Sequence, residues 1–224
     1  MQKFISLISF FISLFAVKYG FSDCRGKIDI APAFVHLDVL NFGKTVKTMD
    51  LAAIKIDANA LIYKGLCIRP GFIYGSNRGT FLSTGCGLGY VIPIKRWCFT
   101  PSFGANYTEV HTKIPIDFFG VKLKVKEKFS SWSPYLSLEV FYRIVKGWRT
   151  GFLFQYAWSR SHTTIKDFGS DKTNAKGPSY AFILERDFND NWSLNLGLAY
   201  NISLTREKHG LRGYGAKLGL AYWF

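Results

Sequence analysis

The chain has 224 residues, of which 48% are hydrophobic and 17% aromatic, with 21 Gly and only 7 Pro. This composition excludes an intrinsically disordered or collagen-like protein. The 29 basic and 15 acidic side chains give a formal net charge of +14, which favours an anionic partner such as lipid headgroups, surface glycans or nucleic acid.

The N-terminus has the pattern of a secretory signal peptide. Lys3 precedes an apolar run from Phe4 to Val17, and small residues follow at Gly20-Phe-Ser22. We predict that residues 1–22 are a signal peptide and residues 23–224 the exported chain; losing Lys3 and Lys18 lowers its charge by two, to +12. A membrane anchor is one alternative, but the run is too short to cross about 30 Å of hydrocarbon. A lipoprotein site at Cys24 is another, which Asp23 disfavours.

Beyond residue 22 the hydrophobic pattern has a period of two, with no sustained helical period. We predict ten strands, each near the roughly 9–11 residues that a tilted membrane strand needs. Their expected ranges are 27–37, 50–63, 66–75, 79–92, 97–110, 131–144, 148–160, 177–186, 192–204 and 212–224. Eight strands remain an alternative, because the start of the exported chain is weakly patterned.

Each predicted strand has one bulky and one small face. Leu82, Leu88 and Tyr90, for example, alternate with Gly85 and Gly87. The exterior of a soluble barrel would carry many Lys, Glu and Asp, whereas here the smaller face is mostly Gly, Ser, Thr and Asn. The pattern favours apolar side chains facing lipid and small polar ones facing a narrow interior. Short turns alternate with longer connections after residues 37, 110, 160 and 204, as periplasmic turns alternate with outer loops.

All six tryptophans fall at predicted strand ends, where indole rings favour a membrane interface. We expect one rim to carry Trp97, Trp148, Trp192 and Trp223, and the other Trp132 and Trp158.

The last strand alternates apolar residues up to the final position, with Leu218, Leu220, Tyr222 and Phe224 on one face. In this ending, and in the organisation of the exported chain, the sequence resembles the small outer-membrane β-barrel proteins of Gram-negative bacteria. The resemblance implies an all-β, antiparallel up-and-down barrel whose last strand pairs with its first. It also implies surroundings of outer-membrane lipid and lipopolysaccharide, and recognition of the four terminal residues by the outer-membrane assembly machinery.

Alternation also assigns charged side chains to the interior. We expect an ionic network of Lys55, Asp57, Arg69, Glu139, Arg143, Arg149, Glu185 and Lys217, with Lys27 and Asp29 also facing inward. Isolated buried charges are costly, so we favour a polar plug that holds the barrel shut. The alternative is a narrow, mildly anion-preferring pore, since wide aqueous channels need about 16 strands.

Four histidines fall near the outer strand ends, at His36, His111, His162 and His209. Some outer-membrane barrels are proteases or lipid A-modifying enzymes with rim residues of this kind. The candidate pairs are His36 with Asp38 or Asp50, and His162 with Asp167. Ser161 and His162 are adjacent, so on a strand they face opposite sides. We predict no catalytic residue, cofactor or metal site, and keep an enzyme acting on lipid A or peptides as the weaker reading.

A long outer loop is expected from Thr112 to Ser130. Within it Lys122, Lys124, Lys126 and Lys128 alternate with other residues, so a hairpin around Phe119-Gly120 would put four ammonium groups on one face. Such an anion-binding stripe suits lipopolysaccharide phosphates or host surface glycans and proteins; the alternative is a solvated loop that blunts a sheet edge. Nucleic acid is not expected, because the chain is exported and has no nucleic-acid fold signature.

Four cysteines, Cys24, Cys67, Cys86 and Cys98, could form two disulfides in an oxidising compartment. Only Cys24, before the first strand, is free to reach Cys67 or Cys98, because the strand positions of the others separate them beyond disulfide reach. The expected function is therefore a surface protein with a structural or adhesion role, with a narrow channel as the alternative.

Overall fold

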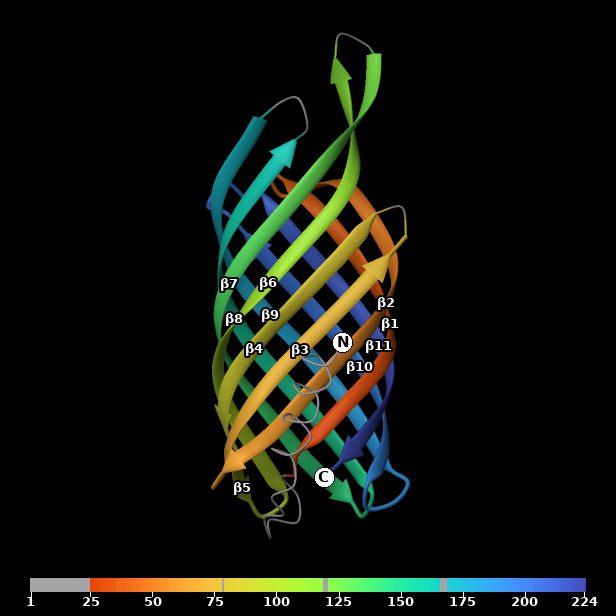
Figure 1. The fold of residues 1–224 in the computed structure, drawn as a ribbon, viewed down its shortest axis with the longest axis vertical. Helices are drawn as coiled ribbons and strands as arrows, with labels where there is room; N and C mark the ends of the chain where they lie inside the picture. Colours follow the sequence, from red (N-terminus) through yellow and green to blue (C-terminus); the bar gives the residue numbers. More distant parts are fainter. Residues whose placement is uncertain (1–24, 78, 119–120, 166–168) are drawn as a thin grey trace, which may run out of the picture.

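A computed structural model describes residues 25–77, 79–118, 121–165 and 169–224 (Figure 1). The predicted signal peptide and Cys24 lie outside these ranges. The described elements are β1 (Lys27–Asn41), β2 (Lys44–Tyr63), β3 (Leu66–Ser76), β4 (Thr80–Tyr90), β5 (Ile92–Ile94), β6 (Trp97–Phe118), β7 (Val121–Val145), β8 (Trp148–Ile165), β9 (Gly169–Asp187), β10 (Trp192–Leu204) and β11 (Gly210–Trp223). In the described ranges no helix is long and apolar enough to cross a membrane.

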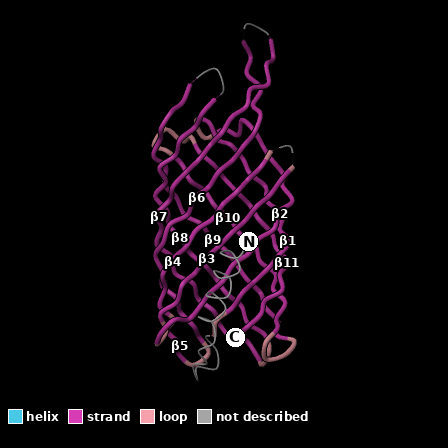
Figure 2. The backbone as a smooth tube through the Cα atoms, viewed as in Figure 1, coloured by secondary structure: helices cyan, strands magenta, loops and turns pink. Residues whose placement is uncertain are grey.

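The strands close into one antiparallel barrel (Figures 1 and 2). Neighbours in sequence pair in turn, and β1 pairs with β11, with Lys27 opposite Trp223. β4 and β5 both pair with β6 and are separated only by Val91, so they form one strand of the wall. The wall therefore has ten strands, which confirms the predicted fold and rejects the eight-stranded alternative.

The strands extend further than predicted at the end of the barrel away from β5, called here the outer end. β6 runs to Phe118 and β7 begins at Val121, where 110 and 131 were expected. The segments after residues 37, 110 and 160 are thus mainly strand rather than loop, because their alternation lets each backbone continue to pair with its neighbour. In Figure 1 the green β6–β7 hairpin projects beyond the other strands.

The barrel exposes its apolar face and buries its polar one. On β1, Phe34 is 51% exposed whereas Asp29 is 3% exposed. The same division holds on β10, where Leu196 is exposed and Asn195 is buried. This is the arrangement that hydrocarbon requires of a closed barrel.

One tryptophan departs from the predicted rim arrangement. Trp97, Trp132, Trp158 and Trp192 are exposed on the outer face, but Trp223 is only 6% exposed. Trp223 faces the lumen, and its indole N–H donates to the Ser193 hydroxyl at 2.8 Å. Its placement on the lipid-facing rim was wrong, because it alternates with the outward-facing Tyr222.

Candidate functional site

Two ion pairs bridge the lumen near its inner end, the end at which β1 begins and β11 ends. Arg69 of β3 donates to Glu139 of β7 at 2.6 Å, and Lys27 of β1 contacts Glu185 of β9 at 3.4 Å. Each pair joins strands three spacings apart in the sheet order, which is about 14 Å along the wall. These two pairs, called the lumen bridges below, therefore run across the interior rather than along it.

Shorter ionic contacts fill the space around the lumen bridges. Lys217 bonds Asp29 and lies 3.6 Å from Asp57, and Lys55 also bonds Asp57. Arg149 bonds Asp187, an acid that lies one residue after the predicted strand 177–186. The Ser193 hydroxyl donates to Glu185, so the carboxylate that ends one bridge has a second partner.

An aromatic ring covers the inner end of this layer. The Arg149 guanidinium carbon lies 4.0 Å from the Trp223 ring centroid and the Lys27 ammonium 5.0 Å from it. Cations over an indole face are stabilised by its quadrupole, most strongly where water is excluded. Trp223 thus holds one cation of a lumen bridge and one of the surrounding contacts.

Arg143, the remaining member of the predicted network, lies at the inner end of β7. Its register partner is Arg149, and its backbone N–H donates to the Arg96 carbonyl at 2.9 Å.

The ionic contacts of this layer are balanced in charge. They join five cations, Lys27, Lys55, Arg69, Arg149 and Lys217, to five anions, Asp29, Asp57, Glu139, Glu185 and Asp187. These contacts leave no net positive charge at the bridges, so they give no reason for the anion preference considered from the sequence.

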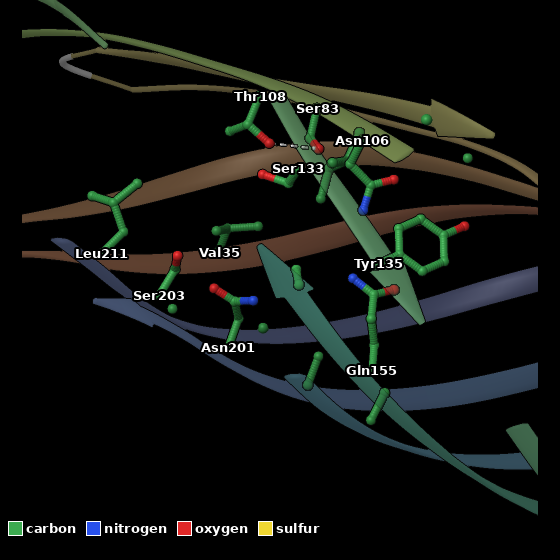
Figure 3. Close-up of a pocket in the computed structure, with 18 of the residues that line it drawn as sticks. Val35, Ser83, Asn106, Thr108, Ser133, Tyr135, Gln155, Asn201, Ser203 and Leu211 are labelled. Carbon is green, nitrogen blue, oxygen red and sulfur yellow. Dashed lines mark hydrogen bonds between the residues drawn. The ribbon is translucent and has the colours of Figure 1, made fainter. Parts of the chain in front are cut away.

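A cavity of about 1210 Å³ occupies the lumen. Between the lumen bridges and the outer mouth its lining includes the neutral polar side chains of Asn106, Tyr135, Gln155 and Asn201 (Figure 3). We call this part of the lumen the vestibule.

Two neighbouring arcs of the vestibule have different chemistry. On one arc, five serines of β7, β8 and β10 form a continuous series of hydrogen bonds, called the hydroxyl ladder: Ser161 to Ser131 (3.2 Å), Ser131 to Ser133 (3.2 Å), Ser133 to Ser159 (2.7 Å) and Ser203 to Ser159 (3.4 Å). On the other arc lies the apolar wall, a packed cluster of Val35, Leu37, Met49, Leu51, Phe81, Val110, Phe129 and Leu211. The sequence analysis identified neither feature.

The histidine and acid residues considered as an enzyme site do meet, but on the outer face of the barrel. His36 Nδ1 lies 2.7 Å from Asp50 Oδ1, and His36 Nε2 lies 3.6 Å from Asp38 Oδ1. Arg212 donates two bonds to Asp38, at 2.7 and 3.1 Å, and Thr48 donates a third at 2.7 Å. Asp38 is thus held by a cation and a hydroxyl, as in a structural ion pair.

Within the described part of the chain, the contacts of His111 and His209 are with carboxylates rather than with a nucleophile. His111 contacts Glu109, and His209 lies 3.5 Å from Glu207. Ser161 is buried on the lumen side, on the opposite face of β8 from His162, as expected. Asp167 lies outside the described residues.

The lysine stripe belongs to β7 rather than to a loop. The β6–β7 register pairs Asp117 with Lys122, Pro115 with Lys124, Lys113 with Lys126 and His111 with Lys128. Lys128 lies 3.2 Å from Glu109. Residues 119–120, the expected turn, lie outside the described ranges.

The terminal residues close the β1–β11 seam. Leu218, Leu220 and Tyr222 are exposed on the outer face. The Phe224 backbone N–H donates to the Gly26 carbonyl at 3.0 Å, and the Phe224 ring stacks at 6.4 Å from that of Tyr222.

The cysteines divide into two states. Cys98 is disulfide-bonded, whereas Cys67 and Cys86 are free thiols. Over the described ranges, no group of three or more His, Cys, Asp or Glu side chains has an arrangement that could hold a metal ion.

Comparison with known proteins places the fold. No family model matches the sequence, and no curated protein matches it. Among solved structures, the outer-membrane protease OmpT of Escherichia coli is similar at 13% identity and a TM-score of 0.57, over 93% of this chain and 99% of that one. The translocator domain of the autotransporter NalP of Neisseria meningitidis is similar at 9% identity and a TM-score of 0.54, over 100% and 95%.

The β domain of the Bordetella autotransporter BrkA is similar at 9% identity and a TM-score of 0.52, over 90% of this chain and 100% of that one. At these identities the likeness concerns the fold alone, and the matched structures include both a protease and autotransporter domains. The chain is a closed ten-stranded β-barrel with the fold of Gram-negative outer-membrane proteins.

Proposed function

We propose that this chain is an outer-membrane surface protein with a closed lumen, which binds anionic glycans through its outer β6–β7 hairpin. The observation that carries the proposal is the pair of lumen bridges, Arg69–Glu139 and Lys27–Glu185. Two ion pairs across the lumen obstruct a path at this level, so the outward function of the barrel falls to the segments that project from it.

The β6–β7 hairpin is the segment that projects furthest (Figure 1). Alternate residues of a strand share a face, so the alternation of Lys122, Lys124 and Lys126 in the sequence favours one basic face. A row of ammonium groups attracts sulfated or phosphorylated glycans over about a Debye length. Lipopolysaccharide carries anionic phosphate groups of the same kind at the membrane surface itself.

Assembly through the terminal strand belongs to the same proposal. Phe224 joins the end of the chain to Gly26 at the seam where the first and last strands pair. Recognition of Leu218, Leu220, Tyr222 and Phe224 by the assembly machinery would deliver the strand that completes the barrel.

Replacing Lys122, Lys124 and Lys126 with Gln is expected to weaken binding of heparan sulfate roughly tenfold or more, because three cations leave one short stretch of β7. Binding of labelled heparan sulfate to bacteria that display the protein measures the effect. Wild-type binding should also weaken as salt is raised.

The matched control replaces Lys64, Lys95 and Lys146 with Gln. All three are exposed in turns at the inner end of the barrel, so the net charge changes equally while the outer hairpin is intact. Equal loss of binding in both triple variants, or no loss in either, would refute a glycan site on the hairpin.

A further inference from the structure

The vestibule is the outer part of the lumen cavity and opens toward the outer end of the barrel. The cavity as a whole is lined from Asn41, Thr205 and His209 at the outer mouth to Arg149 and Trp223 at the inner end. The lumen bridges cross the inner part of this cavity, so a small molecule that enters from outside meets their side chains below the vestibule. The cavity as a whole, about 1210 Å³, exceeds the roughly 300–1,000 Å³ typical of small-molecule sites, and the vestibule is one part of it.

The hydroxyl ladder has hydrogen-bonding capacity that its internal bonds do not use. Its five hydroxyls supply one donor and two acceptor lone pairs each, and they make four bonds with one another. The neutral amides of Asn106, Gln155 and Asn201 extend this polar lining (Figure 3). A ligand with several hydroxyl groups can bond to such a surface without bringing a charge.

The apolar wall faces the vestibule with its less buried members. Leu51 and Val110 are buried within the cluster, whereas Val35, Phe81, Phe129 and Leu211 are only partly buried and line the cavity. Figure 3 shows Val35 and Leu211 beside Ser203 and Asn201. An apolar group placed there would remove their remaining surface from water.

The charged groups below the vestibule are already matched to one another. Lys55 and Lys217 bond Asp57 and Asp29, and Arg69 bonds Glu139. A carboxylate or ammonium on the ligand would therefore lose water without gaining an unmatched counter-charge from these groups.

We propose that the vestibule binds an uncharged glycoside, with the sugar hydroxyls on the hydroxyl ladder and an apolar aglycone on the apolar wall. This site goes beyond the proposed function, because it uses no residue of the lysine stripe. The lysine-to-glutamine triple variant should bind such a ligand as the wild type does, which separates failure of one proposal from failure of the other.

Phenyl β-D-glucoside is a suitable probe, because it is uncharged, soluble and carries one aromatic ring. With the whole chain folded in lipid vesicles, calorimetric titration should give saturable binding with a dissociation constant on the order of 0.1–1 mM for a ligand of this size. Glucose lacks the apolar group and phenyl β-D-glucuronide adds a carboxylate. Each should bind at least about fivefold more weakly.

Gly213→Phe tests the location by filling the vestibule. A Cβ at Gly213 would meet no atom closer than the His36 carbonyl oxygen at 3.7 Å, so a side chain can extend from there into the cavity. The substitution should weaken binding at least about tenfold. Ala52→Phe adds the same ring to the exposed outer face of β2 and should leave binding unchanged.

Two truncations keep the test decisive if Gly213→Phe does not fold. Ser159→Ala removes a hydroxyl that two ladder bonds use, and Phe129→Ala removes a ring of the apolar wall; each should weaken binding about fivefold. Folding of every variant is checked by the difference in gel mobility between heated and unheated samples. Absence of saturable binding to folded wild-type protein up to about 10 mM, or affinity unchanged in the folded vestibule variants, would overturn the proposal.

Discussion

Replacing Glu185 with Leu is expected to lower the free energy of unfolding of the barrel by about 3–5 kcal/mol, the usual cost of breaking a buried ion pair by removing one partner. Glu185 is 0% exposed. It accepts from Lys27 at 3.4 Å and from the Ser193 hydroxyl, so its loss leaves a largely buried ammonium without its bridge partner. Urea titration of the protein in lipid vesicles measures the difference.

Two further variants separate the cost of the unpaired buried charge from other effects of substitution on the free energy of unfolding. Replacing Lys27 with Met in addition should restore most of the lost stability, because the pair is then absent rather than half present. Glu207→Gln changes a side chain that is 77% exposed and should alter the free energy of unfolding by no more than about 0.5 kcal/mol. Wild-type stability in Glu185→Leu would show that the Lys27–Glu185 bridge does not hold the inner layer together.

Replacing both Arg69 and Glu139 with Ala is expected to make the barrel conduct ions. The two side chains cross the lumen and meet in a 2.6 Å contact, so their joint truncation removes this bridge while leaving no unpaired charge behind. The folded double variant should show stepwise single-channel currents in a planar bilayer.

The matched control is Arg69→Met with Glu139→Leu. These side chains also remove the charges but keep most of the volume, so this variant should fold and remain closed. Equal currents in the two double variants would mean that charge rather than side-chain volume blocks the lumen. A folded Ala variant that gives no currents would mean that the Arg69–Glu139 bridge is not a barrier to ions.

Period-two alternation was sufficient to predict the fold. It indicated ten strands and which face of each strand meets lipid, whereas the pairing of the last strand with the first was implied by the resemblance to small outer-membrane barrels. The outer strand ends were less predictable. Lys122 to Lys128 alternate as a strand does, but their charge favoured a loop, and continued pairing with β6 prevails.

Alternation also indicated that Arg69 and Glu185 face inward, but not which residues they contact. The lumen bridges join strands that are distant in sequence and three positions apart in the barrel, so they depend on the accumulated stagger between strands. That stagger is also what places Asp187 beside Arg149 and brings Ser203 of β10 to Ser159 of β8. A single sequence does not give the accumulated stagger between the strands.

The His36 cluster shows the same limit on the outer face. Nearness in sequence suggested His36 with Asp38 or Asp50, and the structure brings all three together. Arg212, which bonds Asp38, is 174 positions away in the chain and reaches it only because β11 closes against β1. Through Arg212, this cluster joins β11 to β1 at the seam of the barrel.

Single-channel recording of the wild-type protein tests the central claim, that the lumen bridges close the barrel. The whole exported chain is refolded, its barrel form is verified by heated and unheated gel mobility, and currents are recorded in a planar lipid bilayer. We predict a folded protein that gives no current steps above the bare membrane. Reproducible unitary steps from the folded wild-type barrel would contradict it, and would make the ionic layer the lining of a narrow pore.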